Sequence, residues 1–395
     1  MAPASLRTWR CAGAAGIALA FAGCAPVPPP PDRLVIQHVE FSDLPGWHED
    51  AQDEALPALR KSCARLNQGP ARTENDLGRL VGSTEQWREL CAAAGALPAG
   101  DKHAARAFFE TRFVPVRLLN NDRDTGLFTG YYEAELQGAR RRSPRYSVPL
   151  HRRPSDLVSV ELGQFRPSLR GQRIAGRVEG GNLRPYASRS QIESGALDNR
   201  ELELVWVDSA VDAFFLHIQG SGRVILDDGG VMRVGFDGQN GHEYVTIGRE
   251  LVARGEIARE NVTMQSIRDW FAANPGRANE IMALNPSYIF FRELPGDAND
   301  GPIGAMGVPL TPGRSVAVDR LQVPLGLPIW LDLVHAEPQD GRVRRLVVAQ
   351  DTGGAIRGPV RGDLFWGFGA AAADIAGRMK AQGSYYALVP RAPGS

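Results

Sequence analysis

Apolar and polar positions divide the chain into a helical part followed by a part dominated by strands. Residues 50–112 are rich in Ala, Leu, Arg and Glu, with single glycines between the runs, which indicates a group of short helices. From Phe113 onward, short apolar runs alternate with turn residues, which is typical of strands. We predict the first two strands at residues 113–116 and 126–133, the second of them aromatic and interrupted by Gly130.

The middle of the chain continues the strand pattern and then changes to helices. Strands are predicted over residues 202–207, 211–219, 222–226 and 231–236. The last two are separated by Asp-Asp-Gly-Gly at residues 227–230, a sequence that favours a hairpin turn. Helices are then predicted over residues 246–254, 263–273 and 276–284.

Strands return toward the C-terminus and are interrupted by one helix. The strands are predicted over residues 315–318, 328–334, 344–349 and 385–389, and the helix over residues 374–381. No internal repeat is found. The pattern as a whole predicts one barrel-like domain built from both ends of the chain, with a second domain inserted within it.

The composition excludes several classes of protein. A chain of 395 residues with 43% hydrophobic and 23% charged residues is neither disordered nor collagen-like. Basic and acidic residues balance at 45 each, so there is no sign of the strongly basic surface that nucleic-acid binding requires. The 44 glycines and 28 prolines favour strands and loops over a helical bundle.

The N-terminus is interpreted as a signal peptide over residues 1–23. Arg7 and Arg10 precede an apolar stretch, residues 11–21, that is too short for a bilayer span of ~20 residues. A poorly ordered N-terminus is the alternative. Removing the leader takes away both of these cations and no acid, which leaves a slightly acidic chain.

Residues 21–24, Phe-Ala-Gly-Cys, resemble a bacterial lipobox. The resemblance implies that Cys24 is lipidated and becomes the mature N-terminus. Because Ala25 follows in place of Asp, it also implies sorting to the outer membrane, with the protein facing the periplasm of a Gram-negative bacterium. Residues 26–31 are rich in proline and form a stiff, extended tether. We assign residues 24–49 to the lipidated cysteine and this tether.

The remaining cysteines form one candidate pair. Once Cys24 is set aside, an exported chain keeps Cys63 and Cys91, in a compartment where disulfides persist. We predict a bridge between them that joins two helical segments, with two buried free thiols as the alternative. The sequence has no CxxC, no HExxH and no close pair of histidines, so neither a metal site nor a cofactor is expected.

Three aspartates lie where apolar, strand-like runs begin or end: Asp319, Asp351 and Asp363. A single aspartate in such a place is usually a turn residue, and Asp351, which is followed by two glycines, also fits that reading. Asp363 differs because Phe365 and Trp366 follow it closely. Apolar surroundings raise the pKa of a carboxyl group, which suits a general acid.

These aspartate segments resemble the three-aspartate (3D) domain of the membrane-bound lytic murein transglycosylase A family. Four upstream segments resemble that family as well: residues 128–133, 183–186, 217–222 and 285–291. The likeness covers residues 110–390. Each motif is weak alone, but the order and spacing of the set are highly specific.

The resemblance implies both an activity and a fold. The family cleaves the β-1,4 bond between N-acetylmuramic acid and N-acetylglucosamine in peptidoglycan without water and leaves a 1,6-anhydromuramic end. The implied fold is mainly β with flanking helices: a double-psi β-barrel assembled from both chain ends, with an inserted second β-barrel. We place a helical region and the first part of the barrel at residues 50–134, the insert at 135–297 and the 3D domain at 298–395.

The resemblance also implies roles for the aspartates. Asp363 is the catalyst and Asp351 supports it. The C6 hydroxyl of the sugar itself acts as the nucleophile, so one carboxyl group suffices, first as acid and then as base.

Other motif residues are implied to line the substrate groove. The expected hydrogen-bond partners of the glycan are Thr129, Gln219 and Ser221. The glycan is expected to approach the backbone closely at Gly130, Gly220 and Gly222. Tyr131 or Tyr132 is expected to stack its ring on a sugar. Neighbours on a strand face opposite ways, so at most one of the two tyrosines faces the groove. Arg184 and Tyr186 are candidates for binding glycan or stem peptide, and structural ion pairing is the alternative for them.

Two other functions remain open at this stage. One is a non-catalytic binder of peptidoglycan or another polysaccharide, and the other is a hydrolase that uses Asp351 and Asp363 as an acid–base pair. The expected partners are peptidoglycan glycan strands and, through the lipid anchor alone, the membrane. Nucleic acid is not expected, and other cell-wall enzymes are left open as partners.

Overall fold

The computed structural model describes residues 31–169, 172–335 and 341–392. The chain divides into two units, Met1–Asp32 and Arg33–Ser395, and the second contains all the helices and strands described below. The predicted leader over residues 1–23 and the lipidation site Cys24 lie outside the described residues. Within the described part of the chain, no helix is both long enough and apolar enough to cross a membrane.

Four helices follow one another in the N-terminal part, as the sequence predicts: α1 (Leu56–Leu66), α2 (Asp76–Leu80), α3 (Thr84–Ala96) and α4 (Lys102–Arg112). Side chains cap three of their N-termini, because Asn75, Ser83 and Asp101 each accept a hydrogen bond from a free backbone N–H of the first turn. The apolar sides of the helices are buried in the main core, with Trp87 and Phe109 fully enclosed.

Part of the segment that was predicted as a tether belongs to the folded body. β1 (Leu34–His38) pairs antiparallel with β2 (Phe113–Asn120), and Trp47 is 1% exposed. The Trp47 ring packs edge-on against Trp330, and its Nε1 donates to Glu110 at 2.8 Å. The prediction that residues 24–49 form a tether is therefore wrong from residue 34 onward, because backbone pairing and a buried tryptophan fix this segment to the body.

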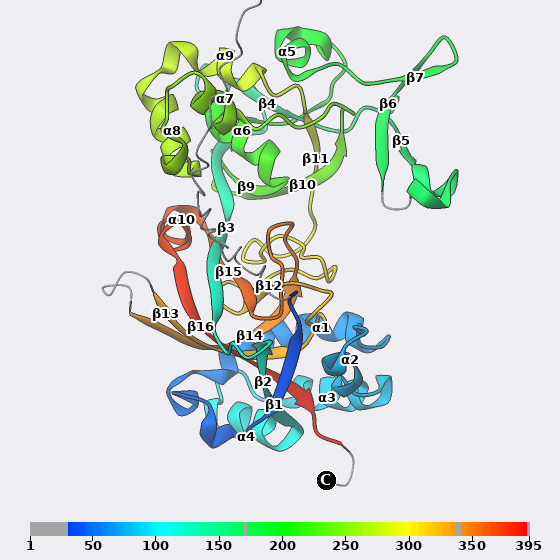
Figure 1. The fold of residues 1–395 in the computed structure, drawn as a ribbon. Coiled ribbons are helices and arrows are strands. Elements are labelled where there is room, and N and C mark those ends of the chain that lie inside the picture. The colour runs from blue at the N-terminus through cyan, green and yellow to red at the C-terminus, as the bar shows by residue number, and fades with distance from the viewer. Residues whose placement is uncertain (1–30, 170–171, 336–340, 393–395) are drawn as a thin grey trace, which may run out of the picture. The chain divides into compact units, whose positions relative to one another are not determined.

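Strands from both parts of the chain form a closed circuit of hydrogen-bonded neighbours (Figure 1). In order around the circuit they are β3 (Gly126–Ala139), β15 (Arg361–Phe368), β12 (Ser315–Val318), β14 (Arg342–Asp351), β13 (Pro328–His335) and β16 (Lys380–Pro390). The circuit closes because β16 also pairs with β3. Its apolar side chains, with those of the N-terminal helices, make the largest core cluster.

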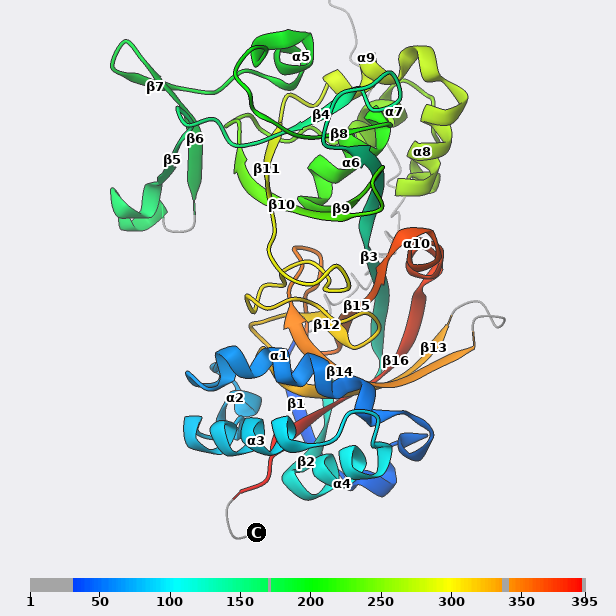
Figure 2. The ribbon, with the colours of Figure 1, turned by 180° about the vertical axis from the view of Figure 1, so that it is seen from behind.

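The second half of β3 leaves this circuit and enters another group of strands, as both ribbon views show (Figures 1 and 2). The group consists of β9 (Ser221–Leu226), β10 (Val231–Gln239), β11 (Ile289–Glu293), β4 (Val148–His151) and β8 (Glu203–Val207). A bridge between Arg152 and Phe291 brings β4 beside β11, and β8 pairs with both β4 and β3. One strand is thus shared by the two circuits.

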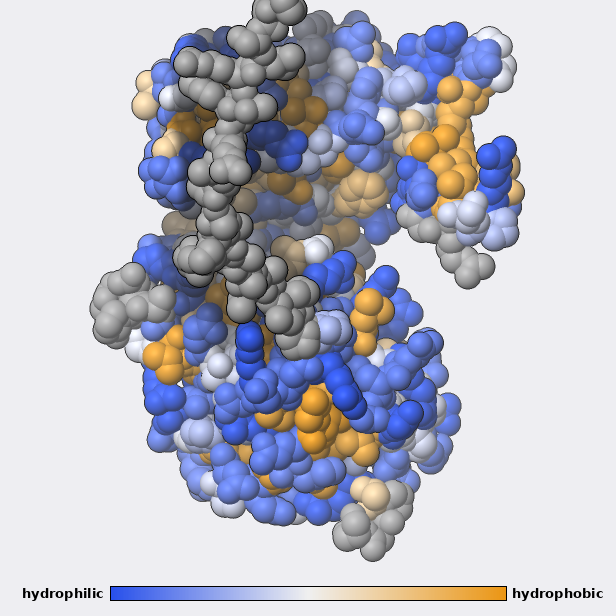
Figure 3. All heavy atoms as spheres, in the orientation of Figure 1, coloured by the Kyte–Doolittle hydropathy of each residue, from blue (hydrophilic) through white to orange (hydrophobic). Residues whose placement is uncertain are grey.

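Helices and a small sheet complete the middle of the chain. The helices are α5 (Arg189–Gln191), α6 (Ala210–Gln219), α7 (Ile247–Ala253), α8 (Met264–Ala273) and α9 (Ala278–Ala283). The sheet consists of β5 (Val158–Glu161), β6 (Arg173–Glu179) and β7 (Asn182–Arg184). Apolar side chains gather on the surface over β5 and β6 (Figure 3), where Val158, Ile174 and Val178 are exposed.

Two sequence predictions of secondary structure are corrected here. Residues 211–219, predicted as a strand, form α6. The side chain of Ser209 caps the start of this helix, and Gly220, with φ of 80°, ends it in the left-handed conformation. A short apolar run does not distinguish a buried helix from a strand, which explains the error. The last helix, α10 (Gly369–Arg378), also begins and ends earlier than predicted.

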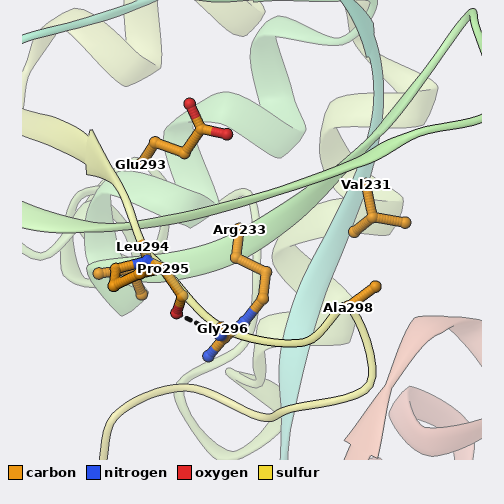
Figure 4. Close-up of a pocket in the computed structure, with 7 residues that line it drawn as sticks. All are labelled: Val231, Arg233, Glu293, Leu294, Pro295, Gly296 and Ala298. Carbon is orange, nitrogen blue, oxygen red and sulfur yellow. Dashed lines mark hydrogen bonds between the residues drawn. The ribbon is translucent and has the colours of Figure 1, made fainter.

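A buried ion pair marks the point where β3 passes from one circuit to the other. Glu133 accepts a hydrogen bond from Nη2 of Arg223 at 2.7 Å, and both side chains are almost fully enclosed. Arg223 also donates to the carbonyl oxygens of Ala298 and Asp300. Arg233 donates to the carbonyl of Pro295 at 2.9 Å beside a cavity of about 390 Å³ (Figure 4). These contacts fasten the segment that leads from the middle of the chain back to the first circuit.

We predict that Arg223→Met destabilises the protein strongly. The substitution leaves Glu133 buried without its cation, which costs about 3–5 kcal/mol in comparable pairs. Urea unfolding should show the midpoint falling at an unchanged slope. The control is Arg254→Met, which removes an exposed ion pair with Glu280 and should cost no more than ~1 kcal/mol. Equal midpoints for both variants would show that the buried pair contributes nothing.

The predicted disulfide is present. Cys63 on α1 and Cys91 on α3 are bonded, 28 residues apart in the sequence. The bond joins two helical segments, as the sequence analysis expects, and both cysteines lie in the main core.

We predict that the double substitution Cys63→Ser with Cys91→Ser lowers the free energy of unfolding by about 3–4 kcal/mol. The estimate is the chain entropy that the closed loop removes from the unfolded state. Urea unfolding of the oxidised protein and of the double variant measures the difference. A change below ~1 kcal/mol would mean that the helices stay together without the crosslink.

Candidate active site

Strand register brings three polar side chains together in the first circuit. Asp363 on β15 lies opposite Thr129 on β3 and, on its other side, opposite Ala317 on β12. Ala317 in turn lies opposite Asp351 on β14, because the register shifts there and skips one residue. This irregularity puts Asp351 beside the small side chain of Ala317, with Asp363 on the opposite side of that strand.

Asp363 has two unequal oxygen atoms. Oδ1 accepts a hydrogen bond from the hydroxyl of Thr129 at 2.6 Å. Thr129 is itself held by Arg361, whose Nη2 donates to the threonine Oγ1 at 3.0 Å. Oδ2 accepts no hydrogen bond from any residue in the described part of the chain. The carboxyl group is therefore fixed through one oxygen, and the other stays free.

The surroundings of Asp363 favour its protonated form. Burial raises the pKa of this carboxyl group above its ordinary value, and the negative charge of Asp351 raises it further. The hydrogen bond from Thr129 and the positive charge of Arg361 lower the pKa, but they do not outweigh burial. A carboxyl group that keeps its proton to higher pH is suited to donate it to a leaving group.

Asp351 is held through both of its oxygens. Oδ1 accepts from the backbone N–H of Ala305 at 2.8 Å, and Oδ2 accepts from the Tyr131 hydroxyl at 2.9 Å. Burial, with the nearby Asp351 charge, keeps the pKa of Tyr131 well above its ordinary value, so the phenol remains a donor. The Tyr131 ring contacts Phe365 with centroids 5.2 Å apart. Asp351 is thus a carboxylate fixed in place by two donors.

The third aspartate of the sequence pattern, Asp319, has a structural role. Asp319 is 4% exposed and accepts hydrogen bonds from the backbone N–H groups of Leu321 and Gly358, at 3.0 and 2.9 Å. It therefore stabilises a turn and ties the 352–360 loop to the end of β12. This is the turn role that the sequence analysis left open for such residues.

Of the two tyrosines, only Tyr131 contacts the aspartates. Tyr132 follows it on the strand and so faces the other way.

Two of the glycines that were expected to line the groove are required by packing within the protein. A Cβ on Gly130 would come 2.8 Å from the Trp366 ring, and one on Gly222 would come 2.5 Å from Leu216. Their part in approaching a glycan stays a prediction.

Gln219, Gly220 and Ser221 lie at the junction of α6 and β9. The next residue, Gly222, is opposite Ala134 on β3. Ala134 is five positions from Thr129 along that strand, a distance of ~17 Å. The group therefore lies beside β3, the strand that pairs with that of Asp363, but beyond direct contact with Asp363.

The structure does not bring Arg184 and Tyr186 to the aspartates. Arg184 ends β7 and is opposite Arg177 on β6. Tyr186 is 2% exposed, and its hydroxyl donates to Asp156 at 2.8 Å. Arg200 donates to both Tyr186 and Asp156. The contacts of Tyr186 agree with the structural alternative, and a binding role for either residue stays a prediction.

His217, in the same motif as Gln219, is a core residue. It is buried, its Nδ1 accepts from the backbone N–H of Ile289 at 3.1 Å, and its ring lies 4.2 Å from that of Tyr288. Burial lowers its pKa well below the ordinary value, so the ring is neutral. It lines a cavity of about 740 Å³ that includes neither Asp351 nor Asp363.

Arg361, which donates to Thr129, is a site residue that was not predicted from the sequence. Arg361 stands two residues before Asp363 on the same strand, so the two side chains face the same side. That spacing is the signal by which it could have been found. Among the described residues, no group of three or more His, Cys, Asp or Glu is arranged to hold a metal ion.

Two family models match successive parts of the chain. Residues 127–292 match a family model described as the MltA specific insert domain, and residues 314–389 match one described as the 3D domain. The membrane-bound lytic murein transglycosylase A of Vibrio cholerae is 36% identical over 208 residues, which cover 51% of this chain and 55% of that protein. The match thus spans about half the length of this relative.

Solved structures match over a longer range. The crystal structure of MltA from Neisseria gonorrhoeae is 34% identical with a TM-score of 0.77, covering 90% of this chain and 91% of that one. Escherichia coli MltA with bound chitohexaose is 25% identical with a TM-score of 0.59, covering 92% and 93%. From both family matches and these structures, we conclude that the chain belongs to the membrane-bound lytic murein transglycosylase A family and carries a 3D domain.

Proposed function

We propose that this protein is a lytic transglycosylase of peptidoglycan. It cleaves the β-1,4 bond between N-acetylmuramic acid and N-acetylglucosamine and leaves a 1,6-anhydromuramic end. Family membership supports this activity. The observation that carries the proposal is Asp363, a largely buried carboxyl group with a raised pKa, one anchored oxygen and one free oxygen.

The chemistry needs only one protein carboxyl group. Protonated Asp363 gives its proton to the glycosidic oxygen, and the bond from that oxygen to C1 of the muramic acid breaks. The C6 hydroxyl of the same sugar attacks C1 and closes the anhydro ring, an intramolecular step that gains from proximity. The Asp363 carboxylate then accepts the C6 hydroxyl proton, which restores the acid without consuming water.

Asp351 supplies a fixed negative charge near the reacting centre. The transition state of glycoside cleavage resembles an oxocarbenium ion, so a nearby carboxylate stabilises it. The donors Tyr131 and Ala305 keep Asp351 in place. Both oxygens of Asp351 already accept a hydrogen bond, which supports its role as a fixed charge.

The strand circuits support a more detailed description of the fold. We assign the first circuit to a double-psi β-barrel, built from residues up to 134 and from residues 298–395, and the second to an inserted β-barrel over residues 135–297. The first part begins near Arg33 in place of residue 50, since β1 belongs to it.

A glycan strand is the proposed substrate. The Escherichia coli relative binds chitohexaose, a polysaccharide fragment. In this chain, the junction of α6 and β9 lies ~17 Å from Thr129, measured along β3. Its residues Gln219, Gly220 and Ser221 are therefore placed to contact a sugar other than the one at Asp363. We further propose anchoring through lipidated Cys24 at the outer membrane, facing the periplasm, in line with the membrane-bound names of the relatives.

We predict that Asp363→Asn lowers the rate of glycan cleavage by at least ~100-fold, because the amide cannot donate the proton. Mass spectrometry of digested peptidoglycan should detect anhydro products for the natural protein and none for the variant at equal times. The control is Asp374→Asn, which removes an exposed carboxylate paired with Arg378 and should leave the rate unchanged. Full activity in Asp363→Asn would exclude this residue as the acid.

We predict a pH dependence with a definite direction. The reaction begins with protonated Asp363, so kcat/KM should fall as pH rises through its raised pKa. Asp351→Asn removes a negative charge that raises that pKa. The falling limb should therefore move to lower pH in Asp351→Asn, along with a reduced rate. A limb that stays in place would show that Asp351 does not act on Asp363 through its charge.

A further inference from the structure

Arg361 is connected to the carboxyl group of Asp363 by hydrogen bonds through Thr129. Its Nη2 donates to Oγ1 of Thr129 at 3.0 Å, and the Thr129 hydroxyl donates to Oδ1 of Asp363 at 2.6 Å. The other terminal nitrogen of Arg361 donates to the carbonyl oxygens of Leu127 and Gly362. The guanidinium group is therefore fixed between the backbones of β3 and β15 through Nη1, and its Nη2 is directed at Thr129.

The direction of these hydrogen bonds follows from the chemistry of the groups. A guanidinium group can only donate, so Thr129 Oγ1 must accept from it. The threonine hydroxyl has a single hydrogen, and its remaining partner is Asp363 Oδ1. When that hydrogen points at Oδ1, both hydrogen bonds of Thr129 are made and its hydrogen has an acceptor, so this is the direction that we assign.

This direction disfavours Oδ1 as the site of the Asp363 proton. A proton on Oδ1 facing Thr129 would meet the hydroxyl hydrogen. The proton of neutral Asp363 then lies on Oδ2, the oxygen that accepts no hydrogen bond from any described residue and is free to meet a substrate. Without Arg361, the threonine hydroxyl could turn and accept a proton from Oδ1.

We propose that Arg361 is a positioning residue that acts through Thr129 and keeps the catalytic proton of Asp363 on Oδ2. This inference rests on the proposed function, since it concerns the acid of that reaction. Neither Arg361 nor Thr129 needs to touch the glycan for this role. The sequence analysis assigned Thr129 to substrate binding, whereas its hydroxyl is engaged by Asp363 and Arg361.

Two effects of Arg361 have to be separated. Its positive charge lowers the pKa of Asp363 from a distance, and its donor orients Thr129. Thr129→Val removes the hydroxyl and keeps the charge, whereas Arg361→Met removes both the charge and the donor. The other titratable groups that face this corner are Asp351 on β14, Tyr131 on β3, and Lys380 and Tyr385 on β16. All of them stay unchanged in these variants.

The test is a double-mutant cycle on kcat for anhydro-product formation, with Thr129→Val, Arg361→Met and the two combined. We expect each single variant to lose kcat about tenfold through misplacement of the proton, with KM little changed. The double variant should lose no more than the larger single loss, because both changes break the same relay. If the fold-loss of kcat in the double variant equals the product of the two single losses, the residues act independently and the inference is overturned.

The pH profile gives a readout that a purely structural role would not move. Arg361→Met removes a charge that lowers the pKa of Asp363, so its falling limb should move to higher pH. The matched control is Arg357→Met, which removes an equal charge from an exposed residue whose ion pair is with Asp319. The control should keep both kcat and the limb of the natural protein. A limb that does not move in Arg361→Met would show that this charge does not act on Asp363, and a kcat that is also unchanged would overturn the inference.

Folding and the parent activity are checked separately. If thermal unfolding shows that Arg361→Met does not fold, Arg361→Gln takes its place, because its amide keeps a donor for the backbone while the charge is lost. Thr129→Ser, which retains the hydroxyl, should keep most of kcat where Thr129→Val does not, and equal losses would overturn the relay. Absence of anhydro product from the natural protein would instead refute the proposed function itself.

Discussion

The cross-strand hydrogen bond from Thr129 to Asp363 is the interaction on which the site depends. It exists because β3 and β15 pair in a parallel register that puts the two residues opposite each other. Placing a carboxyl group in such a strand removes it from water and so favours its neutral form. The hydrogen bond compensates in part and leaves one oxygen free. The same pairing thus produces the fold of this region and an acid that is able to hold a proton.

β3 links this acid to the rest of the molecule. Its first half pairs with β15 and β16, and its second half pairs with β9. The Glu133–Arg223 pair fixes the crossing and also holds the returning segment of the chain. Residues at the start of β9 and Asp363 on β15 are therefore placed against two parts of the same strand, β3, which is an arrangement that suits a long, linear substrate.

The sequence predicted the parts of the structure that local chemistry determines. Most of the strands and helices, the disulfide between Cys63 and Cys91, and the apolar setting of Asp363 could be inferred from neighbouring residues. α6 could not, because its short apolar run is ambiguous without the caps at Ser209 and Gly220. β1 could not either, since its partner β2 lies 75 or more residues away along the chain. The partners of Thr129 required the register of two distant strands.

The source of the oxygen atoms in the product tests the central claim most directly. Peptidoglycan would be digested in water enriched in heavy oxygen, and the muramic ends would be analysed by mass spectrometry. An intramolecular attack by the C6 hydroxyl, with Asp363 as the only acid and base, predicts ends that are one water lighter than hydrolysed ends and carry no heavy oxygen. Heavy oxygen at C1 of the muramic acid would mean that water is the nucleophile, which would contradict this account.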